Sequence, residues 1–438
     1  MFTRRQFLAS VAAPMALAQS VPGIRKRRGA PAEGVAVPRT PDGYPPLPGF
    51  DAAAAGRQLR ERFTDLRNHV IFEYYPWYGT NPWRHWNNPE RQPPFDIAST
   101  AVPAAGPYDS RDTRVLEQHA AWIVESGAGA INVSWWGRGG FEDRAVPQLM
   151  DVMRDHGLKV AFHLEPYTDA RTDRFASDVQ YLLTEYGDKR HWDCFHILKK
   201  ADGTEGPVFK AFATIMGPIG IDCHGRQFAA PLWRPDSVWH QQTDTVRETL
   251  RHDFDHVWIL SDSSDPGMID RVRAAGFDGI APYGVFDYER WPLLARTASD
   301  AGLLFSFSIG TGFDAIVQRN VPPDSCYSPP RFLPPADIDW SEASERERAR
   351  RLALWQVEVS LRSTVNLQMD SSLQNARSGF LAVYIATFNE WHEGTAFEPM
   401  KDYTALLPEE LPYEYHNPAN GRYRLDYLKE RLDRILRR

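Results

Sequence analysis

Cysteine is scarce in this chain of 438 residues, which has three: Cys194, Cys223 and Cys326. They allow at most one disulfide within the chain, and the sequence does not choose the pair. No CxxC or HExxH pattern occurs, so the sequence gives no support for a dedicated zinc site. We therefore expect neither a metal ion nor another cofactor.

Long hydrophobic runs and dense basic stripes are also missing. No segment is long and apolar enough to span a membrane, so we expect no stable membrane insertion. The formal net charge is −7 and the acidic residues are spread along the chain, so nucleic-acid binding has little electrostatic support. A neutral partner is the better expectation, and the oligomeric state stays open.

The N-terminus has the three regions of an export signal. Arg4 and Arg5 precede a short, mildly apolar stretch from Ala9 to Ala18, which ends in a small-x-small pattern. The paired arginines indicate a twin-arginine signal over residues 1–18, and hence a periplasmic or extracellular protein. Residues 19–65 are expected to form a linker rich in Pro and Gly and an N-terminal extension.

The remaining chain, 66–438, has the composition of a single large catalytic domain, since the whole chain is 42% hydrophobic and 24% charged. Strand-like and helix-like segments alternate, which predicts an α/β fold of the (β/α)8 TIM barrel type. The expected strands are 70–75, 130–135, 159–165, 194–198, 256–260, 279–283, 303–308 and 380–386. The expected helices include 114–126, 146–156, 177–186, 268–275 and 341–369. Residues 199–241 are expected to form an insertion.

Aromatic and acidic side chains gather at the ends of these strands. In such barrels the active site lies where the strands end, so the pattern favours one cleft. The 14 Trp, 17 Tyr and 23 Phe suit a sugar site, because aromatic faces cover the C–H surface of pyranose rings. The expected substrate contacts are Tyr75, Trp77, Tyr78, Trp86, Trp135, Trp136, Glu165, Tyr167, Tyr283, Asn389 and His392.

The most informative segment is Thr387–Thr395, which follows the apolar run 380–386. It contains Glu390 and Glu393, which would point to opposite sides if the strand continued, so we expect the chain to turn near Glu390. After the turn both carboxyl groups can line one pocket. Two acids in different surroundings can divide acid and base work, so this pair is the candidate catalytic pair.

The segment Asn389-Glu390-Trp391-His392-Glu393-Gly394-Thr395 resembles the signature of glycoside hydrolase family 99, the endo-α-mannosidase family. Further segments that resemble this family are 72–79, 83–86, 131–137 and 160–167, in the same order along the chain. Pro76 departs from the family pattern.

The resemblance implies a retaining hydrolase that cleaves α-mannosidic bonds in glycans or polysaccharides. By position, Glu390 would deprotonate the 2-hydroxyl of the sugar to give a 1,2-anhydro sugar. Glu393 would be the general acid and later the base that activates water, while Asn389 and His392 would orient the pair. The preference for mannose rests on the resemblance alone.

Three other hypotheses stay open. A transglycosylase or a glycan hydrolase of different specificity would keep the same acids. A non-catalytic sugar-binding barrel would keep the aromatic residues and tolerate loss of either glutamate. A metal-dependent hydrolase would need clustered ligands, for which His85 and His163 are candidates.

Overall fold

The computed structural model describes residues 51–88, 90–222, 224–284, 288–317, 319 and 331–436. The expected signal peptide, 1–18, and the linker up to residue 50 lie outside these residues, as do Cys223 and Cys326. Cys194 is buried and has a free thiol. The disulfide that the sequence allows therefore stays untested.

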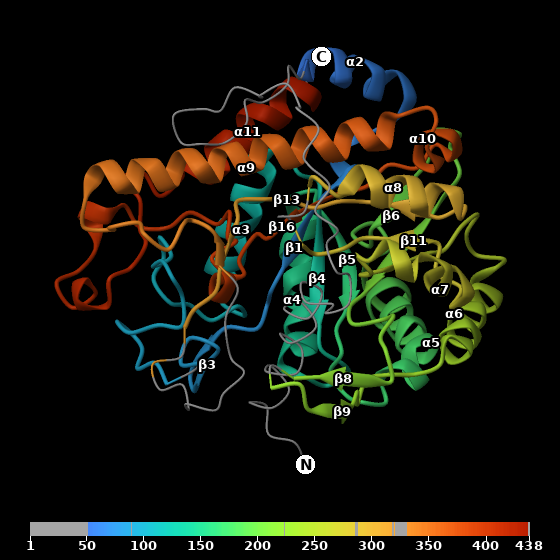
Figure 1. The fold of residues 1–438 in the computed structure, drawn as a ribbon, viewed down its shortest axis with the longest axis horizontal. Coiled ribbons are helices and arrows are strands. Elements are labelled where there is room, and N and C mark those ends of the chain that lie inside the picture. Colours follow the sequence, from blue (N-terminus) through green and yellow to red (C-terminus); the bar gives the residue numbers. More distant parts are fainter. Residues whose placement is uncertain are drawn as a thin grey trace, which may run out of the picture.

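Parallel strands form the centre of the molecule and helices surround them (Figure 1). Every residue of the strands Val70–Tyr74, Ala130–Trp135 and Lys159–Leu164 is buried except Lys159, as expected for parallel strands covered on both faces. In spatial order the barrel strands are β12 (Leu304–Phe305), β11 (Gly279–Ile280), β10 (Trp258–Ser261), β7 (Glu205–Ala211), β5 (Lys159–Leu164), β4 (Ala130–Trp135), β1 (Val70–Tyr74), β16 (Val383–Ala386) and β13 (Ile309–Gly310).

The two ends of this sheet belong to one chain segment, 304–310. Its first part, β12, pairs with β11, and its last part, β13, pairs with β16. Between them Ser306 donates its N–H to the carbonyl of Ile280 and its hydroxyl to the carbonyl of Ala382. The segment thus joins both edges of the sheet, and the expected (β/α)8-type barrel is confirmed.

The fourth barrel strand is not the expected one. The strand in this place is β7, Glu205–Ala211, which pairs in parallel with β5 and β10. The expected strand 194–198 makes one isolated parallel bridge, from Phe195 to Val160, and then continues into β6 (Ile197–Lys199), antiparallel to β7. The expected insertion 199–241 therefore contains a barrel strand, because β7 carries polar residues that weaken its strand pattern.

Each of the five expected helices overlaps an α-helix of the structure, and the described residues form five further α-helices. The helices that overlap are α3 (Thr113–Ser126), α4 (Phe141–Asp155), α5 (Arg171–Leu182), α7 (Ile269–Ala274) and α9 (Ala343–Met369), and the further ones are α2 (Ala52–Arg62), α6 (Asp236–Leu250), α8 (Trp291–Asp300), α10 (Gln374–Ser378) and α11 (Tyr423–Leu436). Figure 1 shows α9 crossing one edge of the molecule, with α2 and α11 beside it. Among the described residues, no helix has the length and apolar character needed to cross a bilayer.

Short hairpins and short helices lie in the loops around the barrel. They are the hairpins β2–β3 (Gly79–Thr80, Trp83–Arg84), β8–β9 (Ile219–Ile221, Gln227–Ala229) and β14–β15 (Phe313–Asp314, Arg331–Leu333), the 3-10 helices η1 (Leu66–His69), η3 (Pro266–Met268), η4 (Trp391–Glu393), η5 (Tyr403–Ala405) and η6 (Leu411–Tyr413), and the π-helix η2 (Leu183–His191).

Candidate active site

The chain turns directly after β16, as the sequence predicts. The turn is η4, Trp391–Glu393, and Gly394 follows it with φ of +63°. A side chain at Gly394 would also meet the carbonyl of Asp314 at 2.9 Å, so this position requires glycine. The turn places Glu390 and Glu393 in one site, where the charge of Glu393 raises the pKa of Glu390.

Glu393 is the more accessible of the two carboxyl groups. It is partly exposed, and its Oε2 accepts a hydrogen bond of 2.7 Å from the hydroxyl of Tyr283. Burial raises the pKa of Glu393 to about 7, against the opposing effect of the Tyr283 hydrogen bond, and the charge of Glu165 adds to the rise. Near neutral pH this carboxyl group can therefore hold or release a proton.

Glu390 is 2% exposed. Its Oε1 accepts from the backbone N–H of His392 at 2.9 Å, and its own N–H donates to the hydroxyl of Thr387 at 2.8 Å. Burial raises the pKa of Glu390 well above the ordinary value, and the charge of Glu393 raises it further. The two carboxyl groups therefore titrate as a pair that can share one proton.

Asn389 and His392 fix the loop against neighbouring segments. The Asn389 side chain accepts from the N–H of Tyr75 at 2.8 Å and donates to the carbonyl of Tyr75 at 3.0 Å. His392 Nε2 lies 3.1 Å from the carbonyl of His85, and burial lowers the pKa of His392 to about 4. The imidazole is therefore neutral at pH 7, and it donates from Nε2 because a carbonyl only accepts.

An aromatic stack stands beside this loop. The ring of Trp77 is stacked on His85 at 4.3 Å and on His392 at 5.7 Å. Tyr75 lies 4.8 Å from Trp77, and the partly exposed Trp136 lies 6.1 Å from it. The structure thus brings four of the expected contact residues together: Tyr75, Trp77, Trp136 and His392.

Tyr75 lies among the carboxyl groups of the site. Burial raises the pKa of its phenol well above the ordinary value, and the charges of Glu165, Glu73, Glu390 and Glu393 add to this effect. Its hydroxyl group therefore stays protonated in a strongly negative surrounding.

Glu165 also belongs to the site. It follows β5, is 5% exposed, and its Oε1 accepts from the hydroxyl of Ser134 at 2.9 Å. The indole N–H of Trp136 donates to the same hydroxyl at 2.9 Å. Burial raises the pKa of Glu165, partly offset by His163 and by the Ser134 hydrogen bond.

Trp86 and Trp135 lie elsewhere, and the structure does not support sugar contact for either. Both are 0% exposed. Trp86 stacks on Tyr78 at 4.1 Å and donates to the carbonyl of Tyr108, whereas Trp135 donates to Asp143 of α4 at 2.7 Å. The sequence predicts Trp135 in a cleft because it ends a strand, but successive residues of a strand point to opposite faces and its side chain points toward α4.

Tyr78 supports the site from behind, whereas the contacts of Tyr167 lie outside the site. Tyr78 is 0% exposed, and its hydroxyl accepts from the N–H of Trp391 at 3.0 Å. Tyr167 is partly exposed and donates to Asp178 of α5. Tyr78 therefore anchors the turn that carries the two glutamates, and Tyr167 is anchored to the helix layer.

A polar cluster that the sequence patterns did not indicate lies in the barrel interior. It consists of Glu73 of β1, Asn132 of β4, His163 of β5 and Lys210 of β7, each at most 1% exposed. Lys210 Nζ lies 2.6 Å from Glu73 Oε1, and Asn132 donates to Glu73 Oε2 at 2.9 Å. The signal that was available is a charged residue inside each of two otherwise buried strands.

The described residues contain no group of three or more His, Cys, Asp or Glu side chains that could hold a metal ion. The two histidines considered as candidates lie in different surroundings. His163 Nδ1 lies 3.2 Å from Glu73, while His85 stacks on Trp77.

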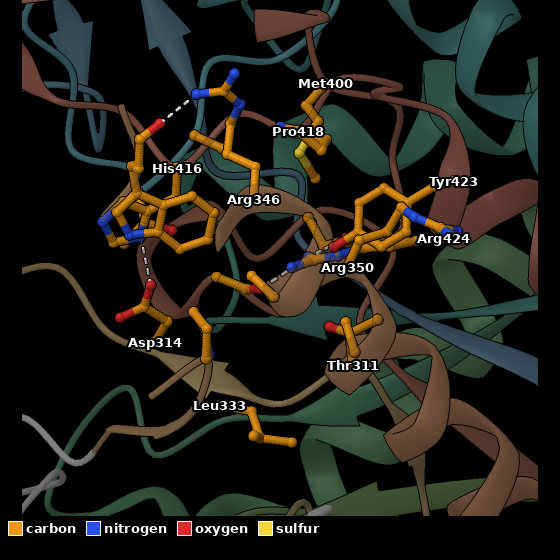
Figure 2. A pocket seen from close by; sticks show the side chains of 18 of the residues that line it. Thr311, Asp314, Leu333, Arg346, Arg350, Met400, His416, Pro418, Tyr423 and Arg424 are labelled. Carbon is orange, nitrogen blue, oxygen red and sulfur yellow. Dashed lines mark hydrogen bonds and ion pairs between the residues drawn. The ribbon is translucent and has the colours of Figure 1, made fainter. Parts of the chain in front are cut away.

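Two hollows border the site. A cavity of about 20 Å³, enough for about one water molecule, lies against Trp391, Gly394 and Ala396. Figure 2 shows this cavity with Arg346, Arg350 and Arg424 around it. At one side, Asp314 Oδ2 and His416 Nδ1 form a hydrogen bond of 2.6 Å. A larger cleft of about 480 Å³ is lined by the β2–β3 hairpin, His85 and the start of α4. The first is too small for a sugar, and the second opens beside the aromatic stack.

The chain is similar to known proteins over most of its length. A sequence model of glycosyl hydrolase family 99 matches residues 65–212. A glycoprotein endo-alpha-1,2-mannosidase-like protein of Danio rerio is 26% identical over 382 residues, which is 79% of this chain and 74% of the relative. The glycoprotein endo-alpha-1,2-mannosidase of Rattus norvegicus is 25% identical and covers 85% of this chain and 78% of the relative.

The fold is shared with the GH99 endo-alpha-mannosidase from Bacteroides thetaiotaomicron. That structure has a TM-score of 0.55 and 20% sequence identity, and the alignment covers 84% of this chain and 97% of that one. The matched family model, the two aligned relatives and the common barrel agree with one another. The chain is therefore similar in sequence to members of glycosyl hydrolase family 99, and this similarity supports glycoside hydrolase activity.

Proposed function

We propose that the protein is an exported, retaining glycoside hydrolase that cleaves α-mannosidic bonds in glycans or polysaccharides. The observation that carries the proposal is the pair Glu390 and Glu393 on one turn at the end of β16, with both pKa values raised by burial. The relatives named for endo-alpha-mannosidase activity support the sugar, and the N-terminal pattern supports export.

In the proposed first step, Glu390 accepts the proton of the sugar 2-hydroxyl while that oxygen attacks the anomeric carbon. The bond to the leaving oxygen breaks, and Glu393 gives its proton to that oxygen. The products of this step are a 1,2-anhydro sugar, protonated Glu390 and ionised Glu393. Tyr283, which donates to Glu393 at 2.7 Å, stabilises the carboxylate formed there.

In the second step, a water molecule attacks the anomeric carbon and gives a proton to Glu393. The bond to the 2-oxygen opens, and this oxygen takes back the proton held by Glu390. Both acids return to their starting states. Two inversions at the same carbon give net retention of configuration.

The pKa directions support a site that holds one proton before the reaction starts. The two pKa values belong to the pair, so substrate binding decides which carboxyl group carries the proton. A 2-hydroxyl at Glu390 and a leaving oxygen at Glu393 require the proton to sit on Glu393. The neutral His392 contributes no charge against this arrangement.

Product analysis on a panel of α-mannans, α-glucans and other glycans tests the proposal. The wild-type protein should release mannose-containing products of retained configuration. Glu390→Gln and Glu393→Gln should each lower kcat by at least about 10²-fold, the range found for general acid–base groups. The exposed Glu409→Gln in the same part of the chain is the control and should behave as wild type.

Three other outcomes would each contradict one part of the proposed function. Products from α-glucans alone would overturn the sugar assignment. An active Glu393→Gln enzyme on a substrate with a poor leaving group would overturn the acid role. Binding without cleavage of any glycan would favour the sugar-binding barrel.

A further inference from the structure

A buried ion pair lies inside the barrel below the catalytic turn. Lys210 Nζ and Glu73 Oε1 are 2.6 Å apart, and both side chains are at most 1% exposed. Removing two charges from water costs several kcal/mol per ion, so a buried pair is weak evidence for a stabilising role. The further contacts of Glu73 and of Lys210 indicate a second role for the pair.

Glu73 contacts His163, which lies beside Glu165. Glu73 Oε2 lies 3.2 Å from His163 Nδ1, and the same nitrogen lies 3.8 Å from Glu165 Oε1. A carboxylate only accepts hydrogen bonds, so Nδ1 carries the hydrogen. Burial would raise the pKa of Glu73, but Lys210 and His163 lower it to about 2. Glu73 is therefore a permanent acceptor that fixes the orientation of the His163 ring beside Glu165.

Lys210 contacts Tyr283, which donates a hydrogen bond to Glu393. The Lys210 ammonium lies over the ring of Tyr384 at 4.9 Å and over the ring of Tyr283 at 5.9 Å, within reach of cation–π attraction. Tyr283 is the residue whose hydroxyl donates to Glu393. The ammonium thus contacts the ring that carries the hydrogen-bond donor of the candidate acid.

We infer that the Glu73–Lys210 pair is a positioning element of the active site. It fixes the orientation of the His163 ring, whose Nδ1 lies 3.8 Å from Glu165 and acts on its charge. On the other side, the Lys210 ammonium contacts the ring of Tyr283, which donates to Glu393. Neither residue is among the groups proposed to exchange protons with the sugar. This inference rests on the proposed function, since it assigns a purpose to groups around the same two glutamates.

The double variant Glu73→Gln with Lys210→Met tests it. It removes both charges and keeps similar shapes, and Gln retains an oxygen that can accept from Asn132 and His163. Replacing both partners of a buried pair is often neutral for stability, so the melting temperature should stay close to wild type. We expect kcat to fall by about tenfold or more and KM to change less than about twofold, because misplaced catalytic groups slow the chemical step.

A matched control comes from a second shielded pair. Lys401 Nζ lies 2.7 Å from Glu410 Oε1, with side chains 16% and 3% exposed. The double variant Lys401→Met with Glu410→Gln removes the same two kinds of charge and should keep wild-type kcat and KM.

A Glu73→Gln/Lys210→Met protein with wild-type kcat would overturn the inference and leave the pair a packing feature. If that protein does not fold, His163→Gln tests the Glu165 side alone. It should retain the melting temperature and lose at least about tenfold in kcat, and wild-type kcat would overturn the inference.

The proposed function and this inference fail in different ways. A wild-type protein that cleaves no glycan would refute the function. Crystal structures of the wild-type and double-variant proteins would then decide the inference. A Tyr283–Glu393 contact and a Glu165 side chain left unchanged in the double variant would overturn it, and displacement of either would support it.

Discussion

At the scale of residues, burial raises the pKa of the two site glutamates and makes them costly to the folded state in their ionised form. The unusual run Asn389–Glu393 made this pair predictable, because five functional side chains follow a buried strand. Their raised pKa values were not predictable, since they depend on burial by residues distant in the sequence.

The pH dependence of stability follows from the direction of the shift at Glu393. Its pKa is raised from 4.5 to about 7 by burial, so the folded state binds more protons than the unfolded state between these values. The contribution is complete below pH 4.5 and is lost as the pH rises through 7. Glu393→Gln cannot ionise, so its melting temperature should exceed that of wild type at pH 8.

Thermal unfolding of both proteins at pH 4.5 and pH 8 measures this effect. The gap should be largest at pH 8 and shrink toward pH 4.5, and Glu409→Gln should show no such pH-dependent gap. A gap that grows toward acidic pH would mean that the folded state lowers the pKa of Glu393.

At the scale of elements, neighbouring residues of one strand have different tasks. In β4, Trp135 packs toward α4, while Trp136 follows the strand and donates to Ser134 in the site. The same alternation puts Glu73, Asn132, His163 and Lys210 inside the barrel. The sequence predicts 194–198 as the fourth strand, whereas the structure has β7 there, whose Lys210 is neutralised by Glu73 from β1. Only the assembled barrel reveals that partner.

The two tryptophans should respond differently to truncation. Trp135→Ala should cost about 3–5 kcal/mol in the free energy of unfolding, as for other buried aromatic side chains. Trp136→Ala should cost less stability but raise KM by about tenfold, equivalent to about 1.4 kcal/mol of binding. Denaturant unfolding and steady-state kinetics on both variants measure these effects. Equal losses of stability and affinity for Trp136→Ala would mark it as a core residue.

At the scale of the whole molecule, the first and last helices of the described residues pack against each other. Helix α2 packs on α11, and Arg60 Nη1 donates to the carbonyl of Ile435 at 2.5 Å. Leu59 and Phe63 are 3% and 7% exposed. Residues 51–63 are therefore part of the folded domain, although the sequence predicts an N-terminal extension there and a catalytic domain that begins at residue 66.

A fragment that begins at residue 66 should be less stable than one that begins at residue 51. Loss of Leu59 and Phe63 removes about 3–6 kcal/mol of hydrophobic burial, at roughly 1.5–3 kcal/mol for each side chain. Thermal unfolding of fragments 51–438 and 66–438, with the full chain as reference, measures this difference. Equal melting temperatures for the two fragments would show that α2 adds nothing to the domain.

The amino-acid sequence was enough to predict the barrel class and the turn that carries Glu390 and Glu393, because buried parallel strands and an acid-rich loop after one of them are local patterns. The tertiary structure decided which strand comes fourth, which tryptophan faces the site, and that Glu73 and Lys210 lie together beneath it. Those facts depend on contacts between residues far apart in the chain. The energy of a buried charge depends on its partner, and only folding brings the two together.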